Sequence, residues 1–127
     1  AWRVAELAHA ERERESFVGL LRQRGFLTAD PATTEDVVQA LHRYLVATPA
    51  RVLCAALTDA VGDRRTQNQP GTDKEYPNWR IPLSGPDGKP LNLERLYRDE
   101  RAFRLASIMN DFSSPMVVPR ADTELVV

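Results

Sequence analysis

The segment from Thr66 to Arg80 carries the side chains best suited to bind a sugar. Its amide groups can donate hydrogen bonds to hydroxyls and accept them in return: Gln67, Asn68, Gln69 and Asn78. Tyr76 and Trp79 offer aromatic faces for the C–H surface of a sugar ring, and Arg80 adds a planar donor fork. From composition alone a second interpretation stays open, in which the rings anchor the loop to a core and the amides cap turns.

No self-sufficient catalytic pattern is found elsewhere. The sequence lacks a glycine-rich phosphate loop and a Cys/His cluster at metal-ligand spacing, so no cofactor or metal is predicted. His9 and His42 fall on predicted helices without a nearby thiol or acidic partner, and we interpret them as surface or packing residues. Cys54 is the only cysteine and lies in an apolar run, which favours a buried structural role in a reducing compartment. No catalytic residue can be assigned.

Composition excludes several classes of partner. The chain has 127 residues, 43% of them hydrophobic and 28% charged, which is ordinary for one soluble domain. The net charge of −1 gives no basic field for nucleic acid or an anionic membrane. The longest apolar run, Val52 to Leu57, is far shorter than the roughly 20 residues of a membrane span. We therefore expect a cytoplasmic protein. Because Ala1 replaces a starting methionine and helical character begins at once, we expect a piece of a longer protein.

Two helices are predicted in the first half. Residues 2–25 show helical spacing of apolar residues and should end at Gly25, which suits a helix C-terminus. A second helix should begin after Thr33 or Thr34, either of which can cap it, and should end before Pro49.

The second half is less regular. Val52 to Leu57 does not alternate, so a strand buried on both faces and a buried helical turn both remain open. Residues 62–90 hold five of the nine prolines and four of the six glycines, which indicates a long loop, and loops this long are usually functional. One or two closing helices are expected at 92–110, and the tail 111–127 is either loose or an edge strand.

Two motifs within the loop add a resemblance to a known family. The sequences NQPGT, from Asn68 to Thr72, and EYPNWR, from Glu75 to Arg80, closely resemble the C-terminal signature of bacterial 4-α-glucanotransferases, also called amylomaltases or disproportionating enzymes. The stretch 48–62 is similar to the same family in the correct order and spacing. The resemblance covers about residues 33–110, matches 2–25 only loosely, and leaves the tail as an extension.

The resemblance implies a (β/α)8 TIM barrel that cleaves an α-1,4-glucosidic bond and transfers the glucan, with retention, to the 4-OH of an acceptor sugar. That chemistry uses an Asp nucleophile, a Glu acid/base and a further Asp. In the family all three precede the matched segment, so none can be assigned to this chain. Substrates would be maltodextrins or glycogen-derived glucans. The chain would be a single segment: a leading helix at 1–30, an eighth βα region at 33–110 with Val52 to Leu57 as the eighth strand, and the tail.

The resemblance also assigns residues. Asn68 and Pro70 match positions that line the glucan cleft near the scissile bond, whereas Asn78, Trp79 and Arg80 match the signature. Asp59 would stand just past the eighth strand, either orienting a neighbour or capping the loop. As a large aromatic, Trp79 is expected to contribute more to stability than Asn68 does.

The isolated chain is expected to be mostly α-helical and inactive. A lone strand would have two open edges, so we also expect the chain to self-associate. The alternative function is a free-standing, non-catalytic helical module that binds α-glucan or a protein partner.

Overall fold

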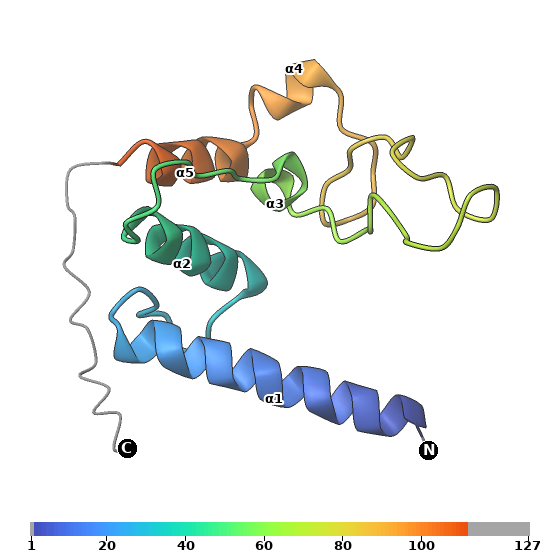
Figure 1. Ribbon diagram of the computed structural model, residues 1–127. Coiled ribbons are helices and arrows are strands. Elements are labelled where there is room, and N and C mark those ends of the chain that lie inside the picture. Colours follow the sequence, from blue (N-terminus) through green and yellow to red (C-terminus); the bar gives the residue numbers. More distant parts are fainter. Residues whose placement is uncertain (1, 112–127) are drawn as a thin grey trace. The chain divides into compact units, whose positions relative to one another are not determined.

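The computed structural model describes residues 2–111, and its regular elements are helical (Figure 1). Within that range the only β pairing is an isolated antiparallel bridge between Ser84 and Pro90. The helices are α1 (Trp2–Gln23), α2 (Thr34–Val46), α3 (Leu57–Val61), α4 (Leu93–Leu96) and α5 (Glu100–Met109). The described residues divide into two compact units, one comprising residues 2–53 with 108–111, the other Cys54–Ser107.

The first unit is a helical hairpin with a small apolar core. Helix α1 confirms the prediction over 2–25, and Gly25 ends it in the left-handed conformation (φ 76°) while its N–H donates to the carbonyl of Arg22 at 3.0 Å. Helix α2 starts at a capping box, in which the side chains of Thr33 and Asp36 each bond the other's backbone N–H. The prediction that Thr33 or Thr34 caps this helix is therefore confirmed for Thr33.

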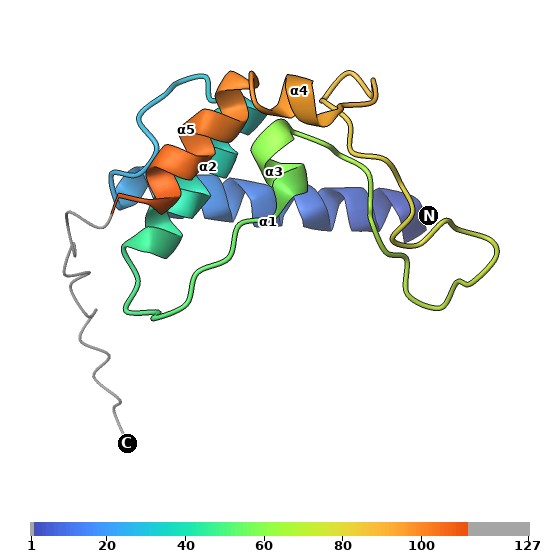
Figure 2. The ribbon, with the colours of Figure 1, turned by 90° about the horizontal axis from the view of Figure 1, so that it is seen from above.

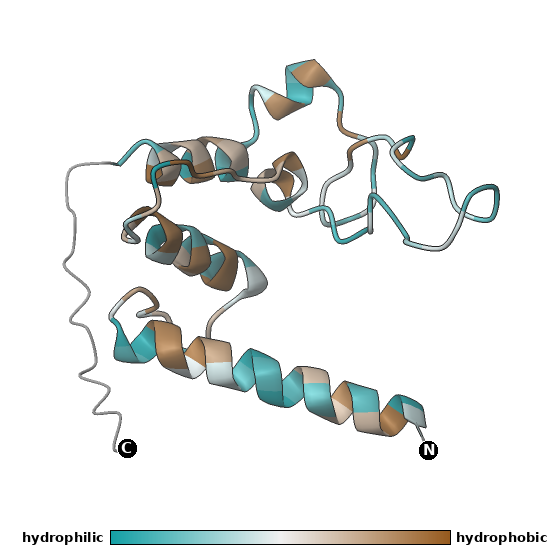
Figure 3. Cartoon of the chain, viewed as in Figure 1, coloured by the Kyte–Doolittle hydropathy of each residue, from teal (hydrophilic) through white to brown (hydrophobic). Residues whose placement is uncertain are grey.

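The core of this unit lies where α2 contacts the C-terminal part of α1. Leu21, Leu27 and Ala40 are buried there, and the rings of Phe26 and Tyr44 meet edge to face at 5.6 Å. Figure 3 shows the contrast along α1, which is hydrophilic in its middle and more apolar toward its C-terminal end. The mixed-charge run from Glu11 to Glu15 lies in that middle and is exposed throughout.

The segment from Val52 to Leu57 is neither a strand nor a buried helical turn. It is extended and irregular up to α3, Val52 is 82% exposed, and Cys54 is also exposed, so the buried role predicted for Cys54 is wrong. A strand satisfies its backbone groups through a neighbouring strand, and residues 2–111 provide none. The expected edge strand or loose tail lies largely outside the described residues.

The second unit is dominated by the predicted loop. The chain follows an irregular path from Gly62 to Asn92, between α3 and α4, as both views show (Figures 1 and 2). A tight turn runs from Gly85 to Gly88, in which the Gly88 N–H donates to the Gly85 carbonyl at 3.0 Å and Gly88 adopts φ 74°. The closing helices are confirmed as α4 and α5. Among residues 2–111, no helix combines the length and the apolar character needed to cross a bilayer.

Candidate functional site

The base of the loop is closed by one buried carboxylate, Asp63. Helix α3 ends at Gly62 (φ 75°), and the next side chain, Asp63, is only 1% exposed. Its carboxylate accepts bonds from the Arg65 guanidinium at 2.8 and 3.0 Å and from the backbone N–H of Ser84, 21 residues later, at 3.0 Å. Arg65 also donates to the carbonyl of Pro82. The Asp63 side chain therefore bonds a distant backbone N–H here, as a neighbouring strand does in a sheet.

The environment keeps Asp63 ionised. The hydrogen bond from Arg65 is the largest cause, followed by backbone N–H groups of Arg65 and Ser84, and together they hold the pKa of the Asp63 carboxyl well below its usual range despite burial. The sequence analysis missed Asp63. Its available signal is an acidic residue directly after a helix-ending glycine and two positions before an arginine.

The tip of the loop is held by the side chain of Asn78. Its Oδ1 accepts from the backbone N–H of Gln69 at 2.7 Å, and its Nδ2 donates to the carbonyl and hydroxyl oxygens of Thr72 at 2.9 and 3.0 Å. The Thr72 hydroxyl in turn donates to the Gln69 carbonyl at 2.7 Å. Asn78 is half-buried and thus joins the two halves of the signature, NQPGT and EYPNWR.

Trp79 follows immediately and is presented to solvent. Its backbone N–H donates to the Gln67 carbonyl at 2.8 Å, its φ is 60°, and 75% of the residue is exposed. A bulky residue in the left-handed region costs about 1–3 kcal/mol, and such strain concentrates where binding surfaces are held in place. The interpretation that Trp79 anchors the loop to a core is wrong, whereas the larger stability contribution expected of Trp79 than of Asn68 stays a prediction for the complete enzyme. Tyr76 does anchor the loop, because it is half-buried and its hydroxyl donates to the Thr66 carbonyl.

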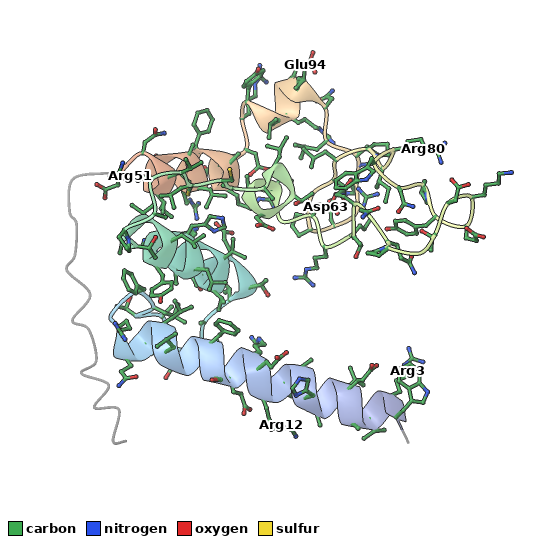
Figure 4. The ribbon with its side chains drawn as sticks, in the orientation of Figure 1. Arg3, Arg12, Arg51, Asp63, Arg80 and Glu94 are labelled. Carbon is green, nitrogen blue, oxygen red and sulfur yellow. The ribbon has the colours of Figure 1, made fainter. Side chains whose placement is uncertain are left out.

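The remaining predicted residues lie on the same loop with their side chains exposed. Asn68, Pro70 and Arg80 are all exposed, and within residues 2–111 neither the Asn68 amide nor the Arg80 guanidinium has a hydrogen-bond or ion-pair partner. Figure 4 labels Asp63 among the side chains at the loop base and Arg80 toward its periphery. Asp59 lies in the first turn of α3 with an exposed side chain, and it is Asp63 that makes the bonds at the base.

The chemistry of this surface suits binding rather than bond cleavage. Its exposed groups are an amide, a guanidinium and an indole ring, which recognise hydroxyls and C–H faces. Glu75 accepts the backbone N–H of Asp73 at 3.0 Å, and this bond lowers the pKa of Glu75 as others lower that of Asp63. Carboxyls held ionised are poor proton donors for glycosidic cleavage. The described part of the chain also has no group of three or more His, Cys, Asp or Glu residues that could hold a metal.

Comparison with known proteins identifies the family. The 4-alpha-glucanotransferase family model matches residues 2–87, so this chain belongs to the 4-alpha-glucanotransferase family. The match begins in α1, which extends the resemblance beyond the region that the sequence motifs covered. No solved structure matches the chain significantly.

Curated relatives carry the same description. The chain is 54% identical over 115 residues to 4-alpha-glucanotransferases of Mycobacterium bovis and of two strains of Mycobacterium tuberculosis. The alignment covers 88% of this chain but only 16% of each relative. This chain therefore aligns with only a small part of each of these relatives.

Proposed function

We propose that this chain is the C-terminal part of a 4-α-glucanotransferase that transfers α-1,4-glucan segments between maltodextrins, including glycogen-derived ones, with retention. It contributes a wall of the substrate cleft and none of the catalytic carboxylates. The observation that carries the proposal is the structure of the loop from Thr66 to Arg80. Hydrogen bonds from its own side chains hold the loop in place, while Asn68, Trp79 and Arg80 are exposed. A preorganised loop spends less free energy on ordering when a sugar binds.

Within that enzyme, Val52 to Leu57 would form the eighth strand of a (β/α)8 barrel. Support comes from its extended path, its exposed apolar residues and the helix before it. Strands from the rest of the polypeptide would satisfy its backbone, and Asp59 would then orient a neighbouring group at the active-site face. Residues 1–30 would be the leading helix, 33–110 the eighth βα region and 111–127 an appended tail.

The proposed partner is the glucan itself, which Asn68 and Pro70 would contact near the scissile bond, with Asn78, Trp79 and Arg80 completing the surface. Of these, Asn78 would act by holding the turn that carries the first two. The proposed location is the cytoplasm. The alternative of a free-standing binding module is less well supported, because the chain spans only 16% of the relatives' length.

The experiment compares Asn68→Ala with Gln23→Ala, both in the complete enzyme. Gln23 is a control of similar chemistry, because it is an exposed amide at the C-terminal end of α1. Losing a sugar hydrogen bond costs about 1–3 kcal/mol, or roughly 5- to 150-fold in kcat/KM. We expect that loss for Asn68→Ala, with an unchanged melting temperature, and no loss for Gln23→Ala. Full transfer activity of Asn68→Ala would reject the assignment.

The isolated chain supplies a second arm of this test. Because it lacks an assignable nucleophile and acid/base pair, we expect it to leave maltotriose unchanged, and production of glucose and longer maltodextrins at enzyme rates would contradict the proposal. Val52 and Leu57 are 82% and 52% exposed, which supports self-association of the isolated chain through 51–57. Light scattering after size exclusion should give at least a dimer; a strict monomer would reject this part.

A further inference from the structure

A surface depression in the second unit carries a positive charge that the loop signature does not explain. Its volume is about 570 Å³, it is open to solvent, and it lies between the turn at 85–91 and the residues of α4 and the start of α5. Small-molecule sites span roughly 300–1,000 Å³, so the depression is large enough for a ligand of sugar size. Its charged lining consists of four cations and two anions: Lys89, Arg95, Arg98, Arg101, Asp87 and Asp99.

Both carboxylates are already engaged by a cation. Asp87 pairs with Lys89, with Nζ and Oδ2 3.5 Å apart, and Asp99 pairs with Arg101, with Nη2 and Oδ2 2.6 Å apart. The Arg101 hydrogen bonds lower the pKa of Asp99, so this pair stays ionised. Two guanidinium groups, those of Arg95 and Arg98, are left without a side-chain partner among residues 2–111.

These two arginines lie close together along the backbone. Arg95 is in α4, Arg98 is in the turn that follows this helix, and the Arg98 N–H donates to the Arg95 carbonyl at 3.0 Å. Like charges so close in the chain repel, and an anion bound by both offsets that repulsion. Their summed charge matches a phosphate monoester, which carries about −1.5 to −2 at pH 7 and has three acceptor oxygens. Guanidinium forks bind such oxygens in pairs.

The rest of the lining adds a surface for an uncharged body. Pro86 and Leu91 contribute apolar walls to the same depression. The C–H face of a sugar ring packs against surfaces of this kind, whereas free phosphate gains nothing from them. We propose that this depression binds a phosphorylated sugar, with Arg95 and Arg98 holding the phosphate and Pro86 and Leu91 covering the ring. The site shares no residue with the loop from Thr66 to Arg80, and it does not depend on the proposed transferase activity.

The test measures binding of glucose 1-phosphate to the complete enzyme by calorimetry, with inorganic phosphate and glucose as comparison ligands. The variant is Arg95→Gln with Arg98→Gln. Its matched control is Arg12→Gln with Arg14→Gln, which removes the same charge from the exposed middle of α1. We expect glucose 1-phosphate to bind more tightly than phosphate, and to weaken with added salt. Its Kd should rise at least about tenfold in the first variant and stay within about twofold in the control.

Other results would overturn the proposal. No binding to the unaltered enzyme would mean that other parts of the polypeptide cover the depression. Equal binding to both variants would place the ligand elsewhere, and phosphate binding as tightly as glucose 1-phosphate would reject a phosphorylated sugar as the ligand. The melting temperature of each variant checks that it folds, and Arg95→Lys with Arg98→Lys, which keeps the charge but loses the forks, should give an intermediate Kd.

Discussion

The helical hairpin of α1 and α2 and the loop from Asp63 to Ser84 are held together by different forces. The hairpin is held by apolar burial centred on Leu21, which is 1% exposed. The loop has little such burial, and is held by two polar side chains, Asp63 and Asn78, that bond backbone groups up to 21 residues away. The stability that apolar burial gives is spread over many contacts and does not depend on pH. The stability that hydrogen bonds give to the loop depends on a few atoms and, at Asp63, on the charge of the carboxylate.

The largest effect is expected from Leu21→Ala. Truncating a fully buried leucine costs about 2–5 kcal/mol, and this core is too small to redistribute the loss. The free energy of unfolding from a urea titration measures it. Leu7→Ala, on the exposed part of the same helix (Leu7 is 65% exposed), should stay within about 0.5 kcal/mol. Equal effects would mean that the hairpin is not held by its core.

The second-largest loss of stability is expected from a substitution at Asp63. Asp63→Ala leaves the Ser84 N–H without its partner, which costs about 1–3 kcal/mol. Hydrogen exchange at the Ser84 amide reports this opening directly. Asp73→Ala, at an exposed acid of the same loop, is the control and should leave that exchange rate unchanged.

The pH dependence of the same loop follows from the direction of the pKa shift. The Asp63 carboxyl has a pKa below its unfolded value of about 4, so the unfolded state binds the proton more readily. Its stabilising effect is therefore complete above about pH 4 and is lost as the pH falls further toward the folded pKa. Asp63→Ala should reduce the loss of stability in acid; an acid limb as steep as that of the unaltered protein would contradict this.

A smaller effect is expected at Asn78. Because this side chain is half-buried, water can replace part of its three hydrogen bonds, and Asn78→Ala should cost about 1–2 kcal/mol. Asn78→Asp keeps the acceptor for Gln69 but puts a carboxylate oxygen opposite the Thr72 carbonyl, where two acceptors repel, so its cost should be no smaller than that of alanine. Exchange at the Gln69 amide measures both. Asn68→Ala should leave the exchange rate at the Gln69 amide unchanged. An increase equal to that of Asn78→Ala would contradict the proposal that Asn78 holds the turn while Asn68 contacts the sugar.

The smallest effect has the opposite sign. Trp79→Gly relieves the left-handed backbone and removes little buried surface, so stability should rise by up to about 1 kcal/mol. Trp79→Ala keeps the strain and should not stabilise. A shift in melting temperature distinguishes the two, and a large destabilisation by both would mean that the indole ring packs after all.

The sequence by itself determined α1 and α2 with their ends, a helical region within 92–110, and the family, but it did not predict α3. Spacing of apolar residues, Thr33 and Gly25 act over one or two turns, so local sequence is enough to place α1 and α2. The motifs from Asn68 to Arg80 identify the family in the same way, because a pattern of residue types needs no coordinates.

Only the tertiary structure decided what each side chain in the loop does. Asp63 and Ser84 are 21 residues apart, and no local pattern predicts their bond. Asn78 and Trp79 are adjacent in one motif, yet one is tied inward by three hydrogen bonds and the other is 75% exposed. The segment from Val52 to Leu57 has the composition of a buried strand, but residues 2–111 provide no neighbouring strand for it. Burial and hydrogen-bond pairing depend on which distant groups come together, and composition alone does not carry that information.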